Sequence, residues 1–135
     1  GKVEAGSTSE YPSSFPDMMP TFAEIAGASL DRPTDGHSLL PAFGGANIAR
    51  QKDLYWEHGD QQALRHGDWK LVRRRLGKKN PETKLFDLAA DPGEKKDVSK
   101  QRPEILEMMI ERAAVTRFPS VIFPNPGLDQ LTGPQ

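Results

Sequence analysis

Two Gly-Asp pairs divide the middle of this sequence into three short runs with the composition of β-strands. The pairs are Gly59-Asp60 and Gly67-Asp68, and the runs occupy residues 54–58, 62–66 and 69–74. Because Gly and Asp tolerate the positive backbone angles of tight hairpin turns, this pattern predicts an antiparallel meander. Alternation along the third run places some apolar area on both faces of the sheet.

A fourth strand and a helix complete the predicted domain. Residues 84–88 form another short β-type run, and residues 91–94 have the Asp-Pro-Gly-Glu sequence of a sharp turn. Pro103 opens a helical pattern that continues to about Arg117, with a broad apolar stripe along one side. We therefore predict an α+β fold, in which a small four-stranded antiparallel sheet packs against a C-terminal helix.

A shorter amphipathic helix is expected before the sheet. Residues 15–26 place apolar side chains at the spacing of one helical face, and Gly27 suits the left-handed position that closes a helix. Because Pro16 and Pro20 both lie early in this pattern, we expect regular helix only from about Pro20. Residues 31–45 predict a loop with at most one turn of helix.

These patterns predict three parts of the chain. Residues 1–48 carry the short helix between loops, residues 49–118 carry the sheet and its helix, and residues 119–135 form an irregular tail. The tail is rich in Pro and shows no periodicity. We expect it either to wrap the domain through Val121, Ile122 and Phe123 or to stay loose.

The composition limits the classes of function. Cys is absent, which excludes disulfides, thiolate zinc sites and a cysteine nucleophile. A formal net charge of -1 gives no whole-molecule attraction to nucleic acid or anionic lipid. No apolar run approaches the roughly 18 residues that a membrane span needs. We therefore expect neither nucleic acid nor a membrane as a partner.

Few individual residues carry a catalytic signal. The three His, which are His37, His58 and His66, lack the close helical spacing of a metal pair. No Ser has the flanking Gly residues of a hydrolase nucleophile. Asp35 and His37 offer two metal ligands, but no third ligand lies at a predictable spacing. We therefore predict no catalytic residue and no metal ligand in this chain.

Two clusters suggest binding of a polar ligand. Residues 55–58, with the sequence Tyr-Trp-Glu-His, place aromatic, acidic and imidazole groups on a strand beside Arg65. Such a group suits a sugar, although aromatic residues in a small sheet are more often part of the core. The basic run at residues 73–79 suggests a nucleic-acid surface, but a solvated hairpin tip fits the neutral total charge better.

Four segments, taken in order, resemble sulfatases of the arylsulfatase type. They are residues 15–27 (FPDMMPTFAEIAG), residues 35–41 (DGHSLLP), residues 55–72 with YWEH and ALRHGDWKLV, and residues 85–94 with LFDL and DPGE. In the family the first segment is a helix that contains Pro-Thr and Leu-Ala-Gly, and the second contains Asp-Gly followed by Ser-Leu-Leu-Pro. The third contains Trp-Glu, then Ala-Val-Arg and Gly-Asp-Trp-Lys-Leu. The fourth contains Leu-Tyr-Asp-Leu followed by Asp-Pro-Gly-Glu. The order and spacing of all four carry the resemblance, since each segment alone is weak.

This resemblance implies the alkaline-phosphatase-like superfamily. Its members have a large α/β domain that holds the active site, and a smaller C-terminal domain in which a four-stranded antiparallel sheet packs against a long helix. Such enzymes hydrolyse sulfate esters with a formylglycine made from Cys or Ser and with a calcium ion that polarises the sulfate. The nucleophile motif, the metal-binding Asp and Asn residues and the catalytic Lys match no position here. The resemblance thus implies a C-terminal fragment that is inactive alone and has no cofactor of its own, while calcium and formylglycine belong to the full-length parent.

The resemblance also implies a role and partners for the fragment. In the family the C-terminal domain closes one side of the substrate pocket, and the Trp-Glu-His hairpin can face bound substrate, which makes His58 and Arg65 candidate substrate contacts. Family members often carry Asn-Arg where this chain has Gln61-Gln62, so that contact departs from the pattern. The implied partners are an aryl or carbohydrate sulfate ester and the missing N-terminal catalytic domain.

Two further expectations follow from a fragment of this kind. The resemblance assigns residues 1–48 to the end of the large α/β domain and residues 49–118 to the C-terminal subdomain. The apolar stripe of the helix at residues 15–26 covers the large domain in the family, so the separate chain is expected to self-associate or to leave its first third disordered. The parent is expected to be exported to the periplasm or secreted. The alternative interpretation is a free-standing module that binds a glycan or a nucleic acid through the hairpin aromatics or the basic run.

Overall fold

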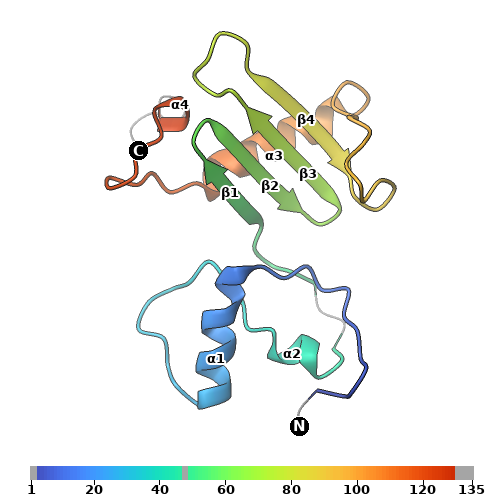
Figure 1. The fold of residues 1–135 in the computed structure, drawn as a ribbon, viewed down its shortest axis with the longest axis vertical. Coiled ribbons are helices and arrows are strands. Elements are labelled where there is room, and N and C mark those ends of the chain that lie inside the picture. The colour runs from blue at the N-terminus through green and yellow to red at the C-terminus, as the bar shows by residue number, and fades with distance from the viewer. Residues whose placement is uncertain (1–2, 47–48, 130–135) are drawn as a thin grey trace. The chain divides into compact units, whose positions relative to one another are not determined.

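The computed structural model describes residues 3–46 and 49–129, and the chain divides into two compact units (Figure 1). The first unit comprises Gly1–Lys52 and the second comprises Asp53–Gln135. No helix in the described ranges is both long enough and apolar enough to cross a membrane. The three-part division with boundaries after residues 48 and 118 stays a prediction, because compactness alone does not define a folding domain.

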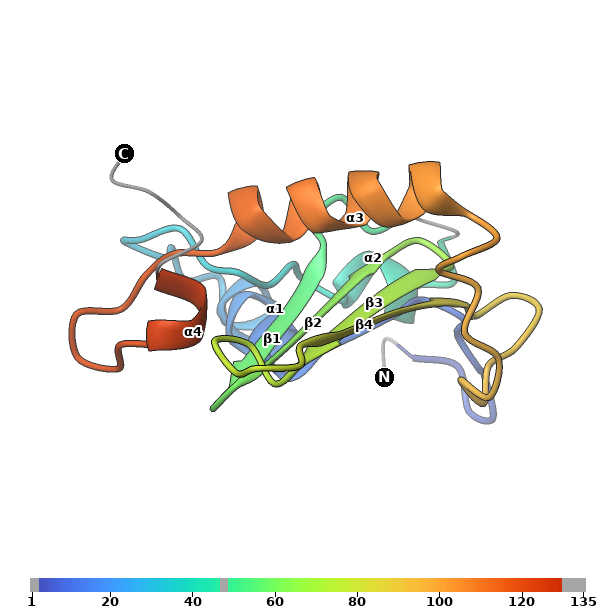
Figure 2. The same ribbon diagram turned by 90° about the horizontal axis from the view of Figure 1, so that it is seen from above.

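The second unit is a four-stranded antiparallel sheet with a long helix across one face (Figure 2). The strands follow one another in space as they do in sequence, and they are β1 (Leu54–His58), β2 (Gln61–His66), β3 (Trp69–Arg74) and β4 (Glu82–Asp87). The helix is α3 (Pro103–Thr116). The predicted α+β fold, with the sheet packed against a C-terminal helix, is confirmed.

Glycines make both tight turns of the meander. Gly59 and Gly67 each have a φ of 56°, a left-handed angle that residues with a Cβ rarely adopt. The fourth strand begins at Glu82, two residues earlier than its apolar pattern predicts. Arg73 and Arg74 of β3 pair with the first residues of β4, so the available partner strand sets this boundary.

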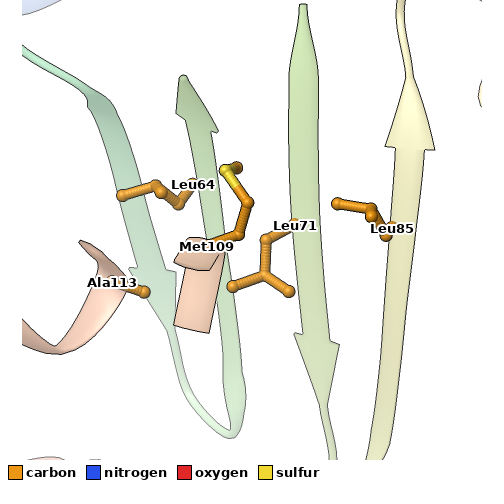
Figure 3. Close-up of a cluster of buried hydrophobic side chains, with 5 residues drawn as sticks. All are labelled: Leu64, Leu71, Leu85, Met109 and Ala113. Atoms are coloured by element: carbon orange, nitrogen blue, oxygen red, sulfur yellow. The ribbon is translucent and has the colours of Figure 1, made fainter. Parts of the chain in front are cut away.

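The core of the second unit lies between the sheet and α3 (Figure 3). Leu64, Leu71 and Leu85 come from three neighbouring strands and meet Met109 and Ala113 of α3, and all five side chains are fully buried. Met109 and Ala113 lie one helical turn apart, so a single face of α3 carries both. The face of the sheet that α3 covers is called the inner face below, and the opposite face is called the outer face.

The first unit contains α1 (Met18–Ala26), which a 3-10 turn at Phe15–Asp17 precedes, and the short helix α2 (Leu40–Phe43). As predicted, Gly27 caps the C-terminal end of α1 with a left-handed φ of 66°. Regular helix begins at Met18 and not near Pro20. The prediction was wrong because Pro20 lies in the first helical turn, where backbone N–H groups have no intrahelical partner in any case.

The tail after α3 turns back and includes a short helix, α4 (Pro126–Asp129). Val121, Ile122 and Phe123 are 98%, 81% and 77% exposed, so the tail does not wrap the unit through these side chains. Leu128 and Asn125 are buried in their place, and the Asn125 side-chain amide donates a hydrogen bond to the Gly59 carbonyl at 2.8 Å. Residues 130–135 of the expected tail lie outside the described residues.

Candidate functional site at the β1–β2 hairpin

The β1–β2 hairpin divides the predicted binding cluster between the two faces of the sheet. Tyr55 packs against the core under α3, and Glu57, two residues further along β1, lies on the same inner face. Trp56 and His58 alternate with them and therefore lie on the outer face. Arg65, which pairs with the first residue of β1, also lies on the outer face. The cluster is therefore two separate groups of side chains.

His58 and Arg65 lie at opposite ends of the outer face of this hairpin. His58 pairs with Gln61 beside the turn, whereas Arg65 pairs with Leu54 at the other end. Gln61 and Arg65 are separated by about 13 Å at the usual rise along a strand. Trp56, which is 44% exposed, lies between them. The structure therefore does not bring His58 and Arg65 around one small group, and a ligand that touches both must extend along the hairpin.

The polar groups of His58 and Arg65 on the outer face are available to a ligand. Arg65 donates a hydrogen bond from Nε to the Gly67 carbonyl at 3.0 Å, and its two terminal nitrogens have no partner within residues 3–46 and 49–129. His58 is exposed, and its imidazole has no hydrogen-bond partner in that part of the chain. Sulfate and hydroxyl oxygens are suitable partners for both groups.

On the inner face, Glu57 belongs to a polar network that holds the tail. Its carboxylate accepts hydrogen bonds from the Arg117 Nε at 2.8 Å and from the Tyr55 hydroxyl at 2.5 Å. Arg117 also donates to Asp129 of α4 at 2.6 Å, and its side chain is almost fully buried. No sequence pattern predicts this network, because its members come from β1, the end of α3 and α4.

The electrostatics of this network favour a structural role. Burial, together with the hydrogen bond to Glu57 and its charge, raises the pKa of Tyr55 to about 12. Burial by itself would raise the pKa of Glu57, but hydrogen bonds from Arg117 and Tyr55 hold that pKa below its usual value. At neutral pH the tyrosine thus keeps its proton and the glutamate stays charged, so neither group is suited to transfer a proton.

Asp53 forms a second linked group at the other end of the sheet. One of its carboxylate oxygens lies 2.7 Å from Nδ1 of His66, and the carboxylate accepts two hydrogen bonds from Arg112 of α3, at 2.9 and 3.0 Å. The Asp53 side chain is almost fully buried, whereas those of His66 and Arg112 are partly exposed. This group fastens the start of β1 to α3.

In the first unit, residues 35–37 lie close against the backbone of the 3-10 turn. The His37 amide donates to Asp17 at 2.9 Å, and Arg50 donates to both carboxylate oxygens of Asp17 at 2.8 and 3.0 Å. A Cβ on Gly36 would lie 2.2 Å from a backbone carbonyl oxygen of the 3-10 turn, so only Gly permits this approach. Asp17 therefore organises the segment that follows α1.

The donor groups of this chain do not fit the cofactors implied by the resemblance. Among the residues that the structure describes, no three His, Asp or Glu side chains are grouped to hold a metal ion. The sequence has no Cys, and it has no Ser in the motif from which formylglycine is made. We therefore assign no chemical step of this chain to calcium or to formylglycine.

The basic run at residues 73–79 does not form a single surface. Arg73 is half-buried on the inner face, where it donates to the Gln62 side chain at 3.1 Å, and burial lowers its pKa. Arg74 alternates to the outer face. Arg75 lies 3.7 Å from the carboxylate of Glu82. The run therefore does not present all of its cations on one face of the sheet, and the absence of a nucleic-acid partner stays a prediction.

Comparisons of the sequence with known proteins find relatives among the sulfatases. No protein-family model matches the chain. The chain is 41% identical over 90 residues to choline-sulfatase of Rhizobium meliloti (strain 1021), which covers 60% of this chain and 16% of that protein. It is 28% identical over 122 residues to arylsulfatase K of Mus musculus, which covers 80% of this chain and 22% of that protein.

Solved structures show the same likeness in three dimensions. The crystal structure of Ps i-CgsB in complex with k-i-k-neocarrahexaose has a TM-score of 0.68 and 31% identity, over 82% of this chain and 25% of that chain. The structure of BT4656 in complex with its substrate, D-glucosamine-2-N,6-O-disulfate, has a TM-score of 0.66 over 84% of this chain and 26% of that chain. At 22% identity, the second match shows the fold alone. The chain thus spans about a quarter or less of the length of these relatives.

Proposed function

We propose that this chain is the C-terminal part of a longer enzyme that hydrolyses sulfate esters, because it is related by sequence and by fold to the C-terminal region of sulfatases. In that enzyme the outer face of the β1–β2 hairpin closes one side of the substrate pocket. The observation that carries this proposal is the arrangement of the outer face, where the exposed indole of Trp56 lies between the imidazole of His58 and the guanidinium of Arg65.

The shape of the outer face favours a carbohydrate sulfate over a small aryl sulfate. A ligand that reaches both His58 and Arg65 must extend over about 13 Å along the hairpin, which several sugar rings do and one aryl ring does not. An exposed indole packs against the apolar face of a sugar ring, and the planar guanidinium of Arg65 matches paired anionic oxygens. The relative Ps i-CgsB, whose structure holds a neocarrahexaose, supports this choice.

The residues of this chain bind and orient the substrate but take no part in the chemical step. The nucleophile, the calcium ion and the acid-base groups belong, in this proposal, to an N-terminal catalytic domain that is the chain's principal partner. Export of the longer enzyme is part of the same proposal.

The apolar stripe of α1 is the proposed contact with that catalytic domain. Met19, Phe22 and Ile25 of α1, with Phe15 of the preceding 3-10 turn, are between 58% and 88% exposed. Asp17 and Thr21, on the other side, are buried within the first unit. Exposed apolar stripes of this kind tend to pack against a partner. We therefore still predict that the chain self-associates when the catalytic domain is absent.

Replacing Arg65 by Ala in the longer enzyme tests the role of the outer face. We expect the KM for a sulfated hexasaccharide to rise roughly tenfold or more with little change in kcat, because a binding contact remote from the ester acts equally in the ground and transition states. The KM for a small aryl sulfate should change little. Initial-rate kinetics on both substrates measure the difference.

An exposed arginine outside the sheet provides the matched control for Arg65. Arg102→Ala removes a guanidinium at the start of α3 and should leave both KM values unchanged. An unchanged hexasaccharide KM in Arg65→Ala would rule out the proposed contact.

A further inference from the structure

A pocket lies at the turn end of the sheet, within the second unit. It has a volume of about 770 Å³, which is within the usual range for ligand sites. Three segments line it: the end of β1 with its turn, the β3–β4 loop, and the tail that leads into α4. We call it the turn-end pocket, and its lining includes His58, Asp60, Lys78 and Phe123.

The walls of the turn-end pocket are held in place by contacts that do not depend on a ligand. The Leu76 amide donates to the Asp60 carbonyl at 3.0 Å and so ties the β3–β4 loop to the hairpin turn. The Asn125 side chain ties the tail to the same turn through Gly59. A Cβ on Gly127 would lie 2.6 Å from the Leu76 carbonyl oxygen, which shows how closely the tail approaches the loop. A preformed pocket loses little conformational entropy when it binds a ligand.

Several groups in the turn-end pocket are free to bind. Within residues 3–46 and 49–129, the side chains of His58, Asp60 and Lys78 form no hydrogen bond or ion pair. Phe123 is 77% exposed although it is large and apolar. Glu57, which also lines the pocket, is by contrast already paired with Arg117.

From this combination we infer that the turn-end pocket binds one ring of a sulfated saccharide chain, at a distance from the ester that is cleaved. The carboxylate of Asp60 and the imidazole of His58 suit sugar hydroxyls, and the ammonium group of Lys78 suits a sulfate. The ring of Phe123 packs against the apolar face of the sugar.

This inference rests on the proposed function for the class of substrate, but its test does not require hydrolysis. Isothermal titration of the 135-residue chain with a carrageenan-derived hexasaccharide should show saturable binding. Phe123→Ala and Lys78→Ala should each weaken this binding, by roughly fivefold to tenfold. Removal of the sulfates from the hexasaccharide should weaken its binding to the wild-type chain. The wild-type chain and Lys78→Ala should then bind the desulfated hexasaccharide with equal affinity.

Neighbouring residues outside the pocket provide matched controls. Phe118 is 87% exposed and does not line the pocket, and Lys79 follows Lys78 in the loop. Phe118→Ala and Lys79→Ala should bind like the wild-type chain. Absence of saturable binding, or equal weakening by the control and pocket variants, would overturn the inference. If the chain binds the hexasaccharide but the longer enzyme hydrolyses no sulfate ester, the pocket stands and the proposed function falls.

Discussion

Replacement of Asp17 by Ala is expected to destabilise the first unit by about 3–5 kcal/mol, the usual cost of leaving one member of a buried ion pair without its partner. The Asp17 side chain is fully buried and that of Arg50 is nearly so. The variant leaves the guanidinium buried without a counter-charge, and it also removes the acceptor for the amides of His37 and Ser14. Because both Trp residues lie in the second unit, amide hydrogen exchange in α1 is the suitable measurement.

An exposed aspartate in the same unit provides the control. Asp35→Ala should change the free energy of unfolding by no more than about 0.5 kcal/mol, since surface substitutions rarely do more. Exchange in α1 that is equally slow in Asp17→Ala and in the wild-type chain would show that the buried pair does not hold this unit.

The same pair gives the first unit a dependence on pH. Burial alone would raise the pKa of Asp17, but the hydrogen bonds from Arg50, His37 and Ser14 outweigh it and hold the pKa below the usual value. A carboxyl whose pKa is lowered by folding stabilises the folded state above its unfolded pKa, near 3.9. The protection of α1 should therefore persist at neutral pH and decline as the pH falls below about 4 towards the folded pKa. Asp17→Ala should lack this component of the acid transition.

Leu71→Ala is expected to destabilise the second unit by about 2–5 kcal/mol. Leu71 is fully buried at the centre of the sheet, where it lies between Leu64 and Leu85 under α3 (Figure 3). The truncation loses apolar burial and leaves a cavity among closely packed neighbours. Trp69 packs against the same core, so its fluorescence during urea unfolding reports on this unit.

A substitution on the exposed side of α3 separates core packing from general sensitivity to mutation. Val115 is 75% exposed, and Val115→Ala should shift the free energy of unfolding by no more than about 0.5 kcal/mol. Similar urea midpoints for Leu71→Ala and Val115→Ala would contradict the placement of the core between the sheet and α3.

The elements of the second unit could be predicted because their signals are local. Gly59 and Gly67 supply the angles that tight turns need, and alternation of apolar residues marks the strands between them. Pro103 begins α3 as its early position predicts. The start of β4 could not be predicted in the same way, because it depends on pairing with a neighbouring strand and not on its own composition.

The candidate site was only partly accessible to sequence reasoning. Alternation along β1 could have separated Tyr55 and Glu57 from Trp56 and His58, since neighbouring residues of a strand lie on opposite faces. The partners of Glu57 could not be inferred, because Arg117 lies 60 residues away along the chain. The turn-end pocket could not be predicted either, because segments far apart in the sequence line it and the tail forms one wall. The apolar residues of the tail at positions 121–123 did not indicate which tail side chains would be buried.

Hydrolysis of an aryl sulfate by the 135-residue chain, measured beside a longer polypeptide that also contains the N-terminal catalytic domain, is the most direct test of the proposed role. Because every group assigned to the chemical step lies outside this chain, we expect steady turnover by the longer polypeptide and none above the buffer rate by the chain alone. Turnover by the purified chain would contradict the assignment of its residues to binding and closure of the pocket.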